Sequence, residues 1–530
     1  GNLGKRSIAV DLKSEAGREI VNRLIDEGDL LAYGAPTASS DSAARAAEAE
    51  QEDDWSPEVA EIARRRALAM EMGGPAKVKR QHDAGKLTAR ERITAIADAG
   101  SFHEIGALTG FADYDAKGHA NRIQPANFVA GTARIDRRKV VLGVDDFTRR
   151  GGSGDAAIHA KQIFLERYAG HMRLPMVRLL DGQSGGGSVK MIRQSGFTYI
   201  PVNPGWDAVV DNMSLIPVVA AGLGPAVGLG AARFVMSHFA VLVQGVGQLF
   251  TAGPPIVFGG TGEKLDKEEL GGADVHRNNG SVERIVADEA AAFQLIRRFL
   301  GYLPSSVFEI PPVRTCHDPV DRRADMLLGV VPRNKRRPYA IGPILDAIFD
   351  VGSVLPYAEY GDSTVTALAR LDGHPVGVVA TDPMKGAAMS VEGAQAIGRL
   401  VDLCETFHLP IVSLTDQAGV NIGLAAERRA TIRAGARAIA AIYQARVPQA
   451  EIILRRVFGV GGAGIVNRHA ANRSWAWPSG DWGSLPAQGG IEAAFRAEIE
   501  ASDDHAATIE RIAAELEAVT SVFRTAEHFG

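Results

Sequence analysis

The apolar residues of the chain recur with two different spacings, one typical of helices and one typical of strands. From Trp55 to about Arg80, apolar side chains recur at the spacing of an amphipathic helix, and the sequence Gly-Gly-Pro at 73–75 interrupts them. Further along, short β-branched runs such as 140–144, 176–181 and 411–416 alternate with glycine clusters and alanine-rich stretches. Strands that alternate with helices predict a layered α/β fold.

The chain also contains an internal repeat. LPMVRLLDGQSG at 174–185 resembles LPIVSLTDQAGV at 409–420, and a helical stretch precedes each copy. Later in each half a second β-branched run follows a proline, and Gly228 stands eleven residues after Pro217 as Gly459 stands eleven after Pro448. Two matched blocks in the same order predict a duplication. We therefore expect two related domains, at residues 56–312 and 320–530.

The residues before these domains have a different composition. Residues 35–55 are small, polar and acidic, which favours a linker over a packed element. The preceding 34 residues combine a short apolar run with an amphipathic helical pattern, and they form a separate N-terminal segment.

Composition narrows the class of protein. The 530 residues are 46% hydrophobic and 23% charged, which is ordinary for a globular protein, and a net charge of −5 argues against nucleic-acid binding. Two cysteines, Cys316 and Cys404, are too few for a disulfide framework or a four-cysteine zinc site, and no HExxH or Cys/His cluster predicts a metal in this chain. No apolar run is long enough to span a membrane and the N-terminus lacks a signal-peptide core, so we expect a cytoplasmic protein.

The glycine turns are the strongest candidates for chemistry. In VGLGAARF (227–234) a β-branched run ends at glycine and small residues lead into a helix, which exposes backbone N–H groups at the positive end of the helix dipole. Two converging N–H groups suit a carbonyl oxygen that gains negative charge. The equivalent FGVG at 458–461 suggests that a second carbonyl is held in the other half. The alternatives are close packing and a phosphate cradle, although no P-loop or complete GxGxxG sequence is present.

Side chains give weaker candidates for catalysis than the glycine turns do. His159, His171, His238, His408 and His469 are scattered and more typical of surface or core histidines than of catalysts. Asp181 and Asp416 end equivalent predicted strands, and we interpret them as caps of the following turns. The pattern favours catalysis by positioning and by backbone electrostatics.

A series of motifs resembles the carboxyltransferase (β) subunits of biotin-dependent acyl-CoA carboxylases, such as propionyl-CoA and methylcrotonyl-CoA carboxylases. The resemblance covers about residue 56 to the end. It is carried by GKLTARERI (85–93), RGGSGDAA (150–157), GQLFTAGPP (247–255), TGEKLDKEELGGADVH (261–276), EIPP (309–312), GHPVGVVATDP (373–383), LCETFHLPIVSLTD (403–416), IRAGARAIAAIYQARVP (432–448) and AWP (476–478).

The resemblance implies a duplicated crotonase-type (ClpP/crotonase) fold of the α/β class, with each domain a superhelix of ββα units. It also implies an active site between the first half of one subunit and the second half of another. By matching to the family, the oxyanion amides are those of Gly228 and Leu229 in the first half and of Val460 and Gly461 in the second. Leu229 and Val460 stand where the family usually has glycine or alanine, which alters the shape of the pocket.

The same resemblance suggests substrate-binding residues. Arg149 and Arg150 lie beside the turn of Gly151, Gly152 and Ser153 and are placed to meet the phosphates of coenzyme A, although solvated surface charge is the alternative. Ala463 matches a position that tunes acyl size in the family and is often larger there. A small residue at this position suggests room for a longer or branched acyl group.

Partners follow from what the sequence lacks. It has no biotin-carrying lysine hairpin and no ATP-grasp signature, so a biotin carboxylase and biotin carrier (α) subunit must supply carboxybiotin, and the family implies a β6 core within an α6β6 assembly. Two alternatives remain at this point: a biotin-dependent decarboxylase subunit, and a scaffold paralogue without activity. Residues 1–34 resemble a fragment of a class III CoA-transferase, too short to carry that activity.

Overall fold

The computed structural model describes residues 54–529, apart from the short segments 154–158, 183–191, 194–195, 199, 201–202, 204 and 469–471. The chain divides into two units, residues 1–70 and 71–530. In the first unit the described helix is α3 (Ser56–Met70), and the CoA-transferase-like segment 1–34 and nearly all of the expected linker lie outside the described residues. Among the described helices, none combines the length and apolar character that a membrane crossing requires.

The predicted N-terminal helical region is confirmed as two helices. α3 ends at Met70, and α4 (Pro75–Asp83) begins at the proline of the Gly-Gly-Pro sequence. Proline is tolerated in the first turn of a helix because its missing N–H would have no partner there, but it cannot continue the preceding helix.

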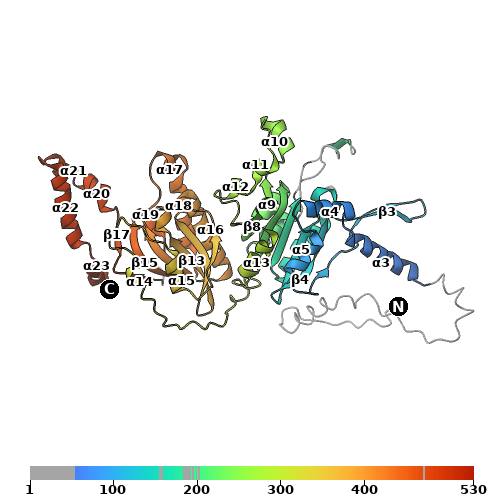
Figure 1. Ribbon diagram of the computed structural model, residues 1–530, viewed down its shortest axis with the longest axis horizontal. Coiled ribbons are helices and arrows are strands. Elements are labelled where there is room, and N and C mark those ends of the chain that lie inside the picture. Colours follow the sequence, from blue (N-terminus) through green and yellow to red (C-terminus); the bar gives the residue numbers. More distant parts are fainter. Residues whose placement is uncertain are drawn as a thin grey trace, which may run out of the picture. The chain divides into compact units, whose positions relative to one another are not determined.

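The second unit contains two large mixed sheets (Figure 1). The first has the order β1-β4-β5-β6-β7-β8-β10, with β9 paired to β7. Its strands are β1 (His103–Glu104), β4 (Phe128–Ile135), β5 (Arg138–Asp145), β6 (Met176–Gly182), β7 (Val218–Val227), β8 (Phe239–Val243), β9 (Gln248–Phe250) and β10 (Arg284–Val286). β2 (Gly110–Tyr114) and β3 (Ala120–Pro125) form a separate hairpin.

The second sheet has the order β11-β12-β13-β14-β15-β16, with β17 paired to β15. Its strands are β11 (Leu355–Ala358), β12 (Thr364–Leu371), β13 (His374–Thr381), β14 (Ile411–Gln417), β15 (Gln449–Phe458), β16 (Arg473–Ala476) and β17 (Asp481–Gly483).

Helices follow the strands in both halves, as the alternation of patterns predicted. In the first half they are α4, α5 (Ala89–Ile96), α6 (His159–Met172), α8 (Trp206–Asn212), α9 (Leu229–Val235), α10 (Pro254–Thr261), α11 (Lys267–Gly271), α12 (Ala273–His276) and α13 (Glu289–Leu300). In the second half they are α14 (Leu327–Val330), α15 (Gly342–Ile348), α16 (Val391–Phe407), α17 (Leu424–Arg428), α18 (Thr431–Gln444), α19 (Gly459–Gly464), α20 (Ala487–Ala494), α21 (Arg496–Glu500), α22 (His505–Val519) and α23 (Val522–Phe529).

The two sheets repeat one topology. In each, an antiparallel pair (β4 with β5, β12 with β13) leads into parallel strands (β5-β6-β7, β13-β14-β15). The register shifts at the same place, between Leu180 and Gly182 in β6 and between Thr415 and Gln417 in β14. A short strand then pairs with the end of the long one, β9 with β7 and β17 with β15. These matches support the duplication predicted from the repeat, whereas the domain boundaries at 312 and 320 stay a prediction.

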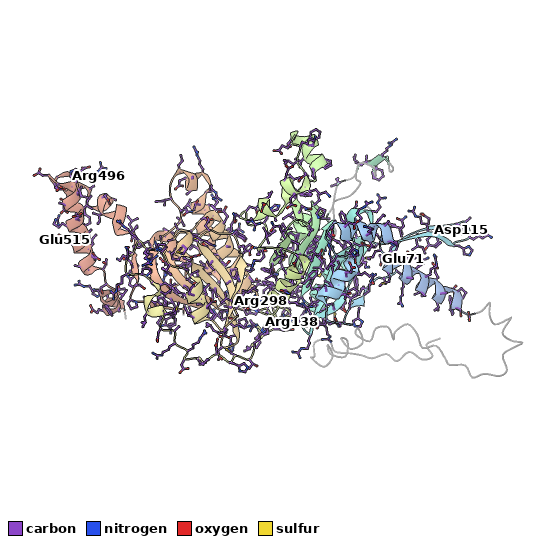
Figure 2. All side chains as sticks on the ribbon, viewed as in Figure 1. Glu71, Asp115, Arg138, Arg298, Arg496 and Glu515 are labelled. Atoms are coloured by element: carbon purple, nitrogen blue, oxygen red, sulfur yellow. The ribbon has the colours of Figure 1, made fainter. Side chains whose placement is uncertain are left out.

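One hydrophobic cluster spans the two halves of the chain. It joins strands of the first sheet to β11 and α16 of the second half. At the junction, Phe299 stacks against Phe239 and Tyr357, and the Tyr357 hydroxyl donates to the carbonyl of His238 at 2.7 Å. Close by, Arg138 donates to the carbonyl of Leu300 and Arg298 to that of Val354 (Figure 2). The two halves are therefore held together by buried contacts as well as by the chain segment that joins them.

Candidate active site

The carboxyl ends of the parallel strands bring the predicted site residues to one edge of each sheet. In the first sheet, β5 ends at Asp145, β6 at Gly182 and β7 at Val227, just before the turns that contain Gly151 and Gly228. In the second sheet, β13, β14 and β15 end before Lys385, Gly419 and Gly459 in the same way. In open α/β sheets this is the edge where ligands bind.

The first glycine turn links β7 directly to α9. Gly228 has φ 53° and ψ −112°, a combination that only glycine adopts without strain. Its carbonyl accepts the N–H of Ala232, and its own N–H donates to the carbonyl of Phe250 at 3.2 Å. The next amides, of Leu229 and Gly230, open the helix and have no partner within it.

The second glycine turn has the same construction. Gly459 follows β15 with φ 60° and opens α19. A Cβ on Gly459 would lie 3.6 Å from the carbonyl oxygen of Ser484, and a Cβ on Gly228 would lie 3.5 Å from that of Thr251. Ser484 and Thr251 are each the residue after the short paired strand. Gly228 and Gly459 are therefore equivalent in space, as the sequence repeat predicted.

This equivalence sets the register of the predicted oxyanion amides. If Gly228 matches Gly459, then Leu229 matches Val460 and Gly230 matches Gly461. The pair Gly228 and Leu229 is thus offset by one residue from the pair Val460 and Gly461. Since the Gly228 N–H already bonds Phe250, the symmetric pairs of helix-opening amides are Leu229 with Gly230 and Val460 with Gly461.

The surroundings of Gly461 leave no room for a side chain. A Cβ there would lie 2.9 Å from the carbonyl carbon of Gly419 and 3.1 Å from the backbone nitrogen of Val420. Val460, in contrast, points its side chain outward with 63% exposure, and Ala463 is exposed one turn further along α19. The glycine at 461 therefore lets the loop after β14 approach the start of α19.

The turn at 149–153 lies at the same edge of the first sheet as Gly228. Arg150, Gly151 and Gly152 all have positive φ, and the Cα of Gly152 would be 2.7 Å from a Cβ on Gly182 at the end of β6. Ser153 accepts a hydrogen bond from Asn127 through its carbonyl oxygen. Arg149 is half-buried, and burial lowers its pKa. The rest of the RGGSGDAA motif, 154–157, lies outside the described residues.

The second sheet has a matching turn. In the first half, the N–H of Asp146 donates to Asn127 and its carboxylate accepts from the N–H of Thr148. In the second half, the N–H of Asp382 donates to the carbonyl of Ser363, and its carboxylate accepts from the N–H of Met384. The next N–H in each turn, of Arg149 and of Lys385, donates to the carbonyl of its aspartate. Each half therefore places a cationic residue at the same position.

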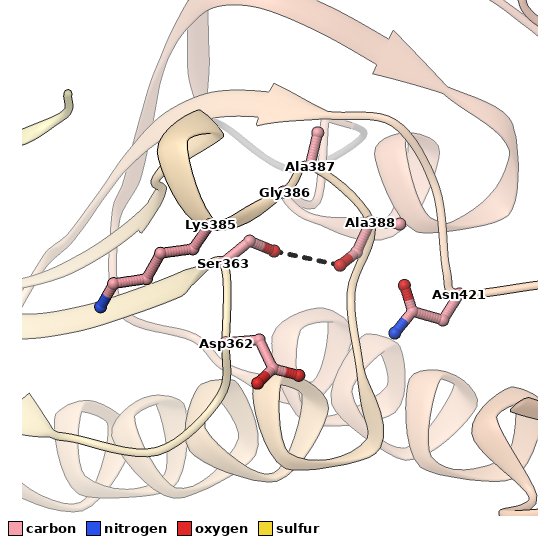
Figure 3. Close-up of a pocket in the computed structure, with 7 residues that line it drawn as sticks. All are labelled: Asp362, Ser363, Lys385, Gly386, Ala387, Ala388 and Asn421. Carbon is pink, nitrogen blue, oxygen red and sulfur yellow. Dashed lines mark hydrogen bonds between the residues drawn. The ribbon is translucent and has the colours of Figure 1, made fainter. Parts of the chain in front are cut away.

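A pocket of about 530 Å³ lies at this edge of the second sheet (Figure 3). Its lining residues are Asp362, Ser363, Lys385, Gly386, Ala387, Ala388 and Asn421. The Ser363 hydroxyl donates to the carbonyl of Ala388, and the Lys385 side chain extends away from Asn421. The N–H of Asn421 donates to the carbonyl of Met389, and the N–H of Ala418 donates to that of Ala387. The pocket is therefore continuous with the loop that contacts Gly461. Sequence reasoning did not find this pocket.

The interpretation of Asp181 and Asp416 as turn caps is not what the structure shows. Asp416 is fully buried and accepts hydrogen bonds from Arg455 at 3.0 Å and from the side chain and backbone of Arg456 at 2.5 and 3.1 Å. Burial opposes ionisation, but the two arginines hold the pKa of Asp416 below its usual value. Asp181 is also fully buried and accepts from Gln81, Lys86 and Arg92.

The Asp181 cluster explains the GKLTARERI motif. Arg92 is fully buried, and its guanidinium bonds Asp181 at 2.8 Å, both oxygens of Glu289 at 2.8 and 2.9 Å, and the carbonyl of Leu223 at 3.0 Å. Thr88 caps α5 reciprocally with Glu91. The motif therefore anchors α4 and α5 beneath the strand that leads to Gly228. Sequence reasoning missed this because the partners lie far apart in the chain.

The histidines behave as predicted where the structure describes them. His159 and His171 are exposed. His238 is buried, accepts from the N–H of Val218 and donates to the carbonyl of Met213, and burial lowers its pKa to about 3. His408 contacts the carbonyl of Val307. His469 lies outside the described residues.

One group of possible metal ligands occurs among the described residues, at Cys316, Asp318 and Asp350. Its carboxylates already accept backbone hydrogen bonds, Asp318 from Val351 and Asp350 from Asp372 and Gly373. These bonds tie together the segment that joins the halves, and the group lies away from the glycine turns in sequence.

Comparison with known proteins finds one matching domain family and several similar enzymes. The model of the carboxyl transferase domain matches residues 80–528. The carboxyltransferase subunit of propionyl-CoA carboxylase from Haloferax mediterranei is 30% identical over 450 residues, covering 84% of this chain and 86% of the relative. The alpha subunit of methylmalonyl-CoA decarboxylase from Propionigenium modestum is 28% identical over 446 residues, covering 82% and 84%.

A solved structure has a similar fold. The transcarboxylase 12S hexamer with methylmalonyl-coenzyme A and methylmalonic acid bound superposes with a TM-score of 0.79 at 27% identity, over 94% of this chain and 92% of that one. The likeness therefore covers both sheets and both glycine turns.

Proposed function

Because the chain belongs to the carboxyl transferase family, we propose that its two glycine turns hold the two carbonyl oxygens of a carboxyl transfer from carboxybiotin to an acyl-CoA. The chain is an acyl-CoA carboxylase carboxyltransferase subunit, and its fold is the crotonase-like α/β fold expected from the sequence. The observation that carries the proposal is the repeated strand, positive-φ glycine and helix at Gly228 and Gly459.

The first turn would bind the thioester. The helix-opening amides of Leu229 and Gly230, with Gly228 shaping the turn, would donate to the thioester oxygen and stabilise it as the α-carbon loses its proton. Such donors, fixed before the reaction, are worth on the order of 3–4 kcal/mol of barrier each. The acceptor carbon is the α-carbon, or the vinylogous carbon of an unsaturated acyl group.

The second turn would bind the biotin ring. Carboxybiotin would supply the carboxyl group as CO2, and the ureido nitrogen freed by that release would accept the α-proton, so that the α-carbon can form its new bond with the CO2. The amides of Val460 and Gly461 would donate to the ring carbonyl, and the pocket of about 530 Å³ beside them offers polar groups from Lys385 and Asn421. This role for the pocket rests on its continuity with the loop at Gly419.

Substrate contacts follow the predicted residues. Arg149, with Gly151, Gly152 and Ser153 at the edge of the first sheet, is placed to meet the phosphates of coenzyme A, as Arg150 is. Ala463 would face the acyl group, and its small side chain would leave space for a longer or branched chain.

The assembly is also part of the proposal. The glycine turns lie on different sheets (Figure 1), so a second copy of the chain would bring a first-half turn opposite a second-half turn. A β6 core with biotin-carrying α subunits around it, located in the cytoplasm, is the arrangement we propose. Two alternatives, a decarboxylase subunit and an inactive scaffold, are not favoured. The family match is to catalytic subunits, and the chain is 30% identical to the propionyl-CoA carboxylase subunit but 28% identical to the decarboxylase subunit.

The isolated chain is expected to show no ATP-dependent carboxylase activity, because it has neither a biotin attachment sequence nor an ATP-grasp signature. Adding the biotinylated α subunit should restore carboxylation, measured as incorporation of labelled bicarbonate with acetyl-, propionyl-, branched and unsaturated acyl-CoA esters. The ester preference would identify the substrate. Activity of the chain alone, without any biotinylated protein, would reject the assignment.

Deleting residues 1–34 is expected to leave carboxyl transfer unchanged, since the family match begins at residue 80. The measurement is kcat/KM of the reconstituted complex and the mass of the assembly in solution. A smaller assembly after deletion would show instead that the segment contributes a subunit contact.

A further inference from the structure

The turn at 149–153 has a backbone conformation that depends on support from outside the turn. Arg150, Gly151 and Gly152 have φ values of 54°, 63° and 67°, so three successive residues are left-handed. This region is unfavourable for a residue with a side chain, and such a residue persists only where the surrounding structure fixes it. The contacts around the turn therefore decide how its binding groups are placed.

Hydrogen bonds fix the two ends of this turn. At one end, the N–H of Gly73 donates to the Thr148 hydroxyl at 2.8 Å, and that hydroxyl donates to the carboxylate of Asp146. A Cβ on Gly73 would overlap the carbonyl of Thr148, so the segment before α4 packs closely against the turn. At the other end, the side-chain amide of Asn127 donates to the carbonyl of Ser153 at 2.8 Å.

The middle of the turn lies against the aromatic ring of Phe147. A Cβ on Gly151 would lie 3.7 and 3.8 Å from two carbons of this ring. The ammonium of Lys86 lies over the same ring, 4.0 Å from its centroid. An ammonium above the face of an aromatic ring is attracted to it electrostatically. Lys86 therefore reaches the turn through a single ring.

The carboxylate of Asp181 holds Lys86 in this position. The Nζ of Lys86 donates to both carboxylate oxygens, at 2.8 and 3.0 Å, and its side chain is only 7% exposed. Gly224 leaves the space for it, since a Cβ there would lie 3.1 Å from Nζ. Burial lowers the pKa of Lys86, whereas the charge of Asp181 favours the protonated form. The ammonium therefore has a fixed place between a carboxylate and a ring.

The two cations of the Asp181 cluster make different connections. Arg92 connects Asp181 to Glu289 on α13. Lys86 connects the same carboxylate to Phe147, and so to the turn. The first connection joins elements of the core, whereas the second reaches a loop at the edge of the sheet. Lys86 is therefore the member of the cluster that can act on the binding turn.

We propose that Lys86 is a positioning residue for coenzyme A, which acts through Phe147 to hold the turn at 149–153 in its binding conformation. This inference rests on the proposed function, which places the coenzyme A phosphates at Arg149 and Arg150. Without the ammonium, the turn leaves its left-handed conformation for part of the time, and the affinity falls by that fraction. The thioester is held at the other turn, so kcat is unaffected.

The test compares Lys86→Met, Phe147→Leu and the double variant in the reconstituted complex. Each single variant should raise the Kd for coenzyme A, measured by calorimetric titration, by about fivefold or more. The KM for acyl-CoA should rise by a similar factor, while kcat stays within about twofold. Phe147→Leu leaves the ion pairs of the cluster intact, so unchanged binding in this variant overturns the proposal even if Lys86→Met fails to assemble.

The double variant separates positioning from stability. In the Phe147→Leu background, Lys86→Met should change the Kd by less than about twofold, because the route to the turn is already lost. It should still lower the midpoint of chemical denaturation, because Asp181 loses an ion-pair partner in either background. A purely structural role would lower the midpoint and leave Kd and KM unchanged.

Two matched controls lie outside the cluster. Lys79→Met removes an exposed lysine of α4 that pairs with Asp83. Phe308→Leu removes a ring that lies under the guanidinium of Arg173. Both variants should bind coenzyme A as the unmodified complex does.

The proposal is overturned if an assembled Lys86→Met complex binds coenzyme A as tightly as the unmodified complex, or if the two effects on Kd add in full in the double variant. A lower kcat at unchanged KM would also overturn it, since Lys86 would then act on the chemical step. A complex that binds coenzyme A and responds to the variants as expected, but transfers no carboxyl group, would reject the proposed function alone.

Discussion

Gly461→Val is expected to lower kcat by about a hundredfold or more, in line with the loss of one oxyanion donor. Two effects combine. The branched side chain would cover the amides that open α19, and its Cβ would meet the backbone of Gly419 at 2.9 Å, so the loop after β14 must move. Steady-state carboxylation of the reconstituted complex measures the loss.

Three controls make this result specific. Gly329→Val, where a Cβ meets nothing within 4 Å, should retain full activity. His159→Ala and His171→Ala should retain most of it, since both histidines are exposed and have no assigned role. A large loss at either histidine would mean that a side-chain base exists, and near-normal kcat in Gly461→Val would remove the second turn from the mechanism.

Arg92→Leu is expected to lower the free energy of unfolding by about 3–5 kcal/mol, the usual cost of removing one member of a buried ion pair. The substitution leaves Glu289 without its guanidinium partner and Asp181 with Lys86 and Gln81 alone. The shift in the midpoint of chemical denaturation measures the effect.

Arg511→Leu is the matched comparison. Arg511 pairs with Glu498 and Glu515 at the surface, where solvent screens the charges, so its substitution should change the midpoint little. If Arg92→Leu also changed the midpoint little, the Asp181 cluster would not be what anchors α4 and α5.

The duplication and the glycine turns could be predicted because their signals are local. A β-branched run, a glycine and a helix adjoin in the sequence, and the proline-to-glycine spacing in both halves placed Gly228 and Gly459 at equivalent positions. The strands at 140–144, 176–181 and 411–416 fall within β5, β6 and β14. Periodicity and repeat together were enough for the α/β class and the duplication, whereas the crotonase-type fold was implied by the family resemblance.

The buried ion pairs could not be predicted in this way. Lys86 and Arg92 reach Asp181 from 95 and 89 residues away, and nothing adjacent to Asp181 in the sequence indicates a cationic partner. A carboxylate at the end of a strand is compatible with capping or with pairing, and only the packed structure decides between them.

The hydrogen bond of the Gly228 N–H could not be predicted from the sequence either. Its bond to Phe250 depends on β9 pairing with the end of β7, a contact between strands that are separated by α9 and β8. The matched motif could name the residues of the turn, but which N–H groups remain available is a property of the neighbouring strand.

The junction between the halves limits how far this architecture can extend. β10, at the last-strand edge of the first sheet, lies against the segment that follows β11, at the first-strand edge of the second, as the bonds of Arg284 and Glu283 to Glu359 indicate. A head-to-tail contact of this kind can in principle continue into an open array. The outer strand β16 has only four residues, all exposed and beginning with Arg473, which is a poor template for another unit. Polymerisation along this direction is therefore disfavoured by the last edge strand itself.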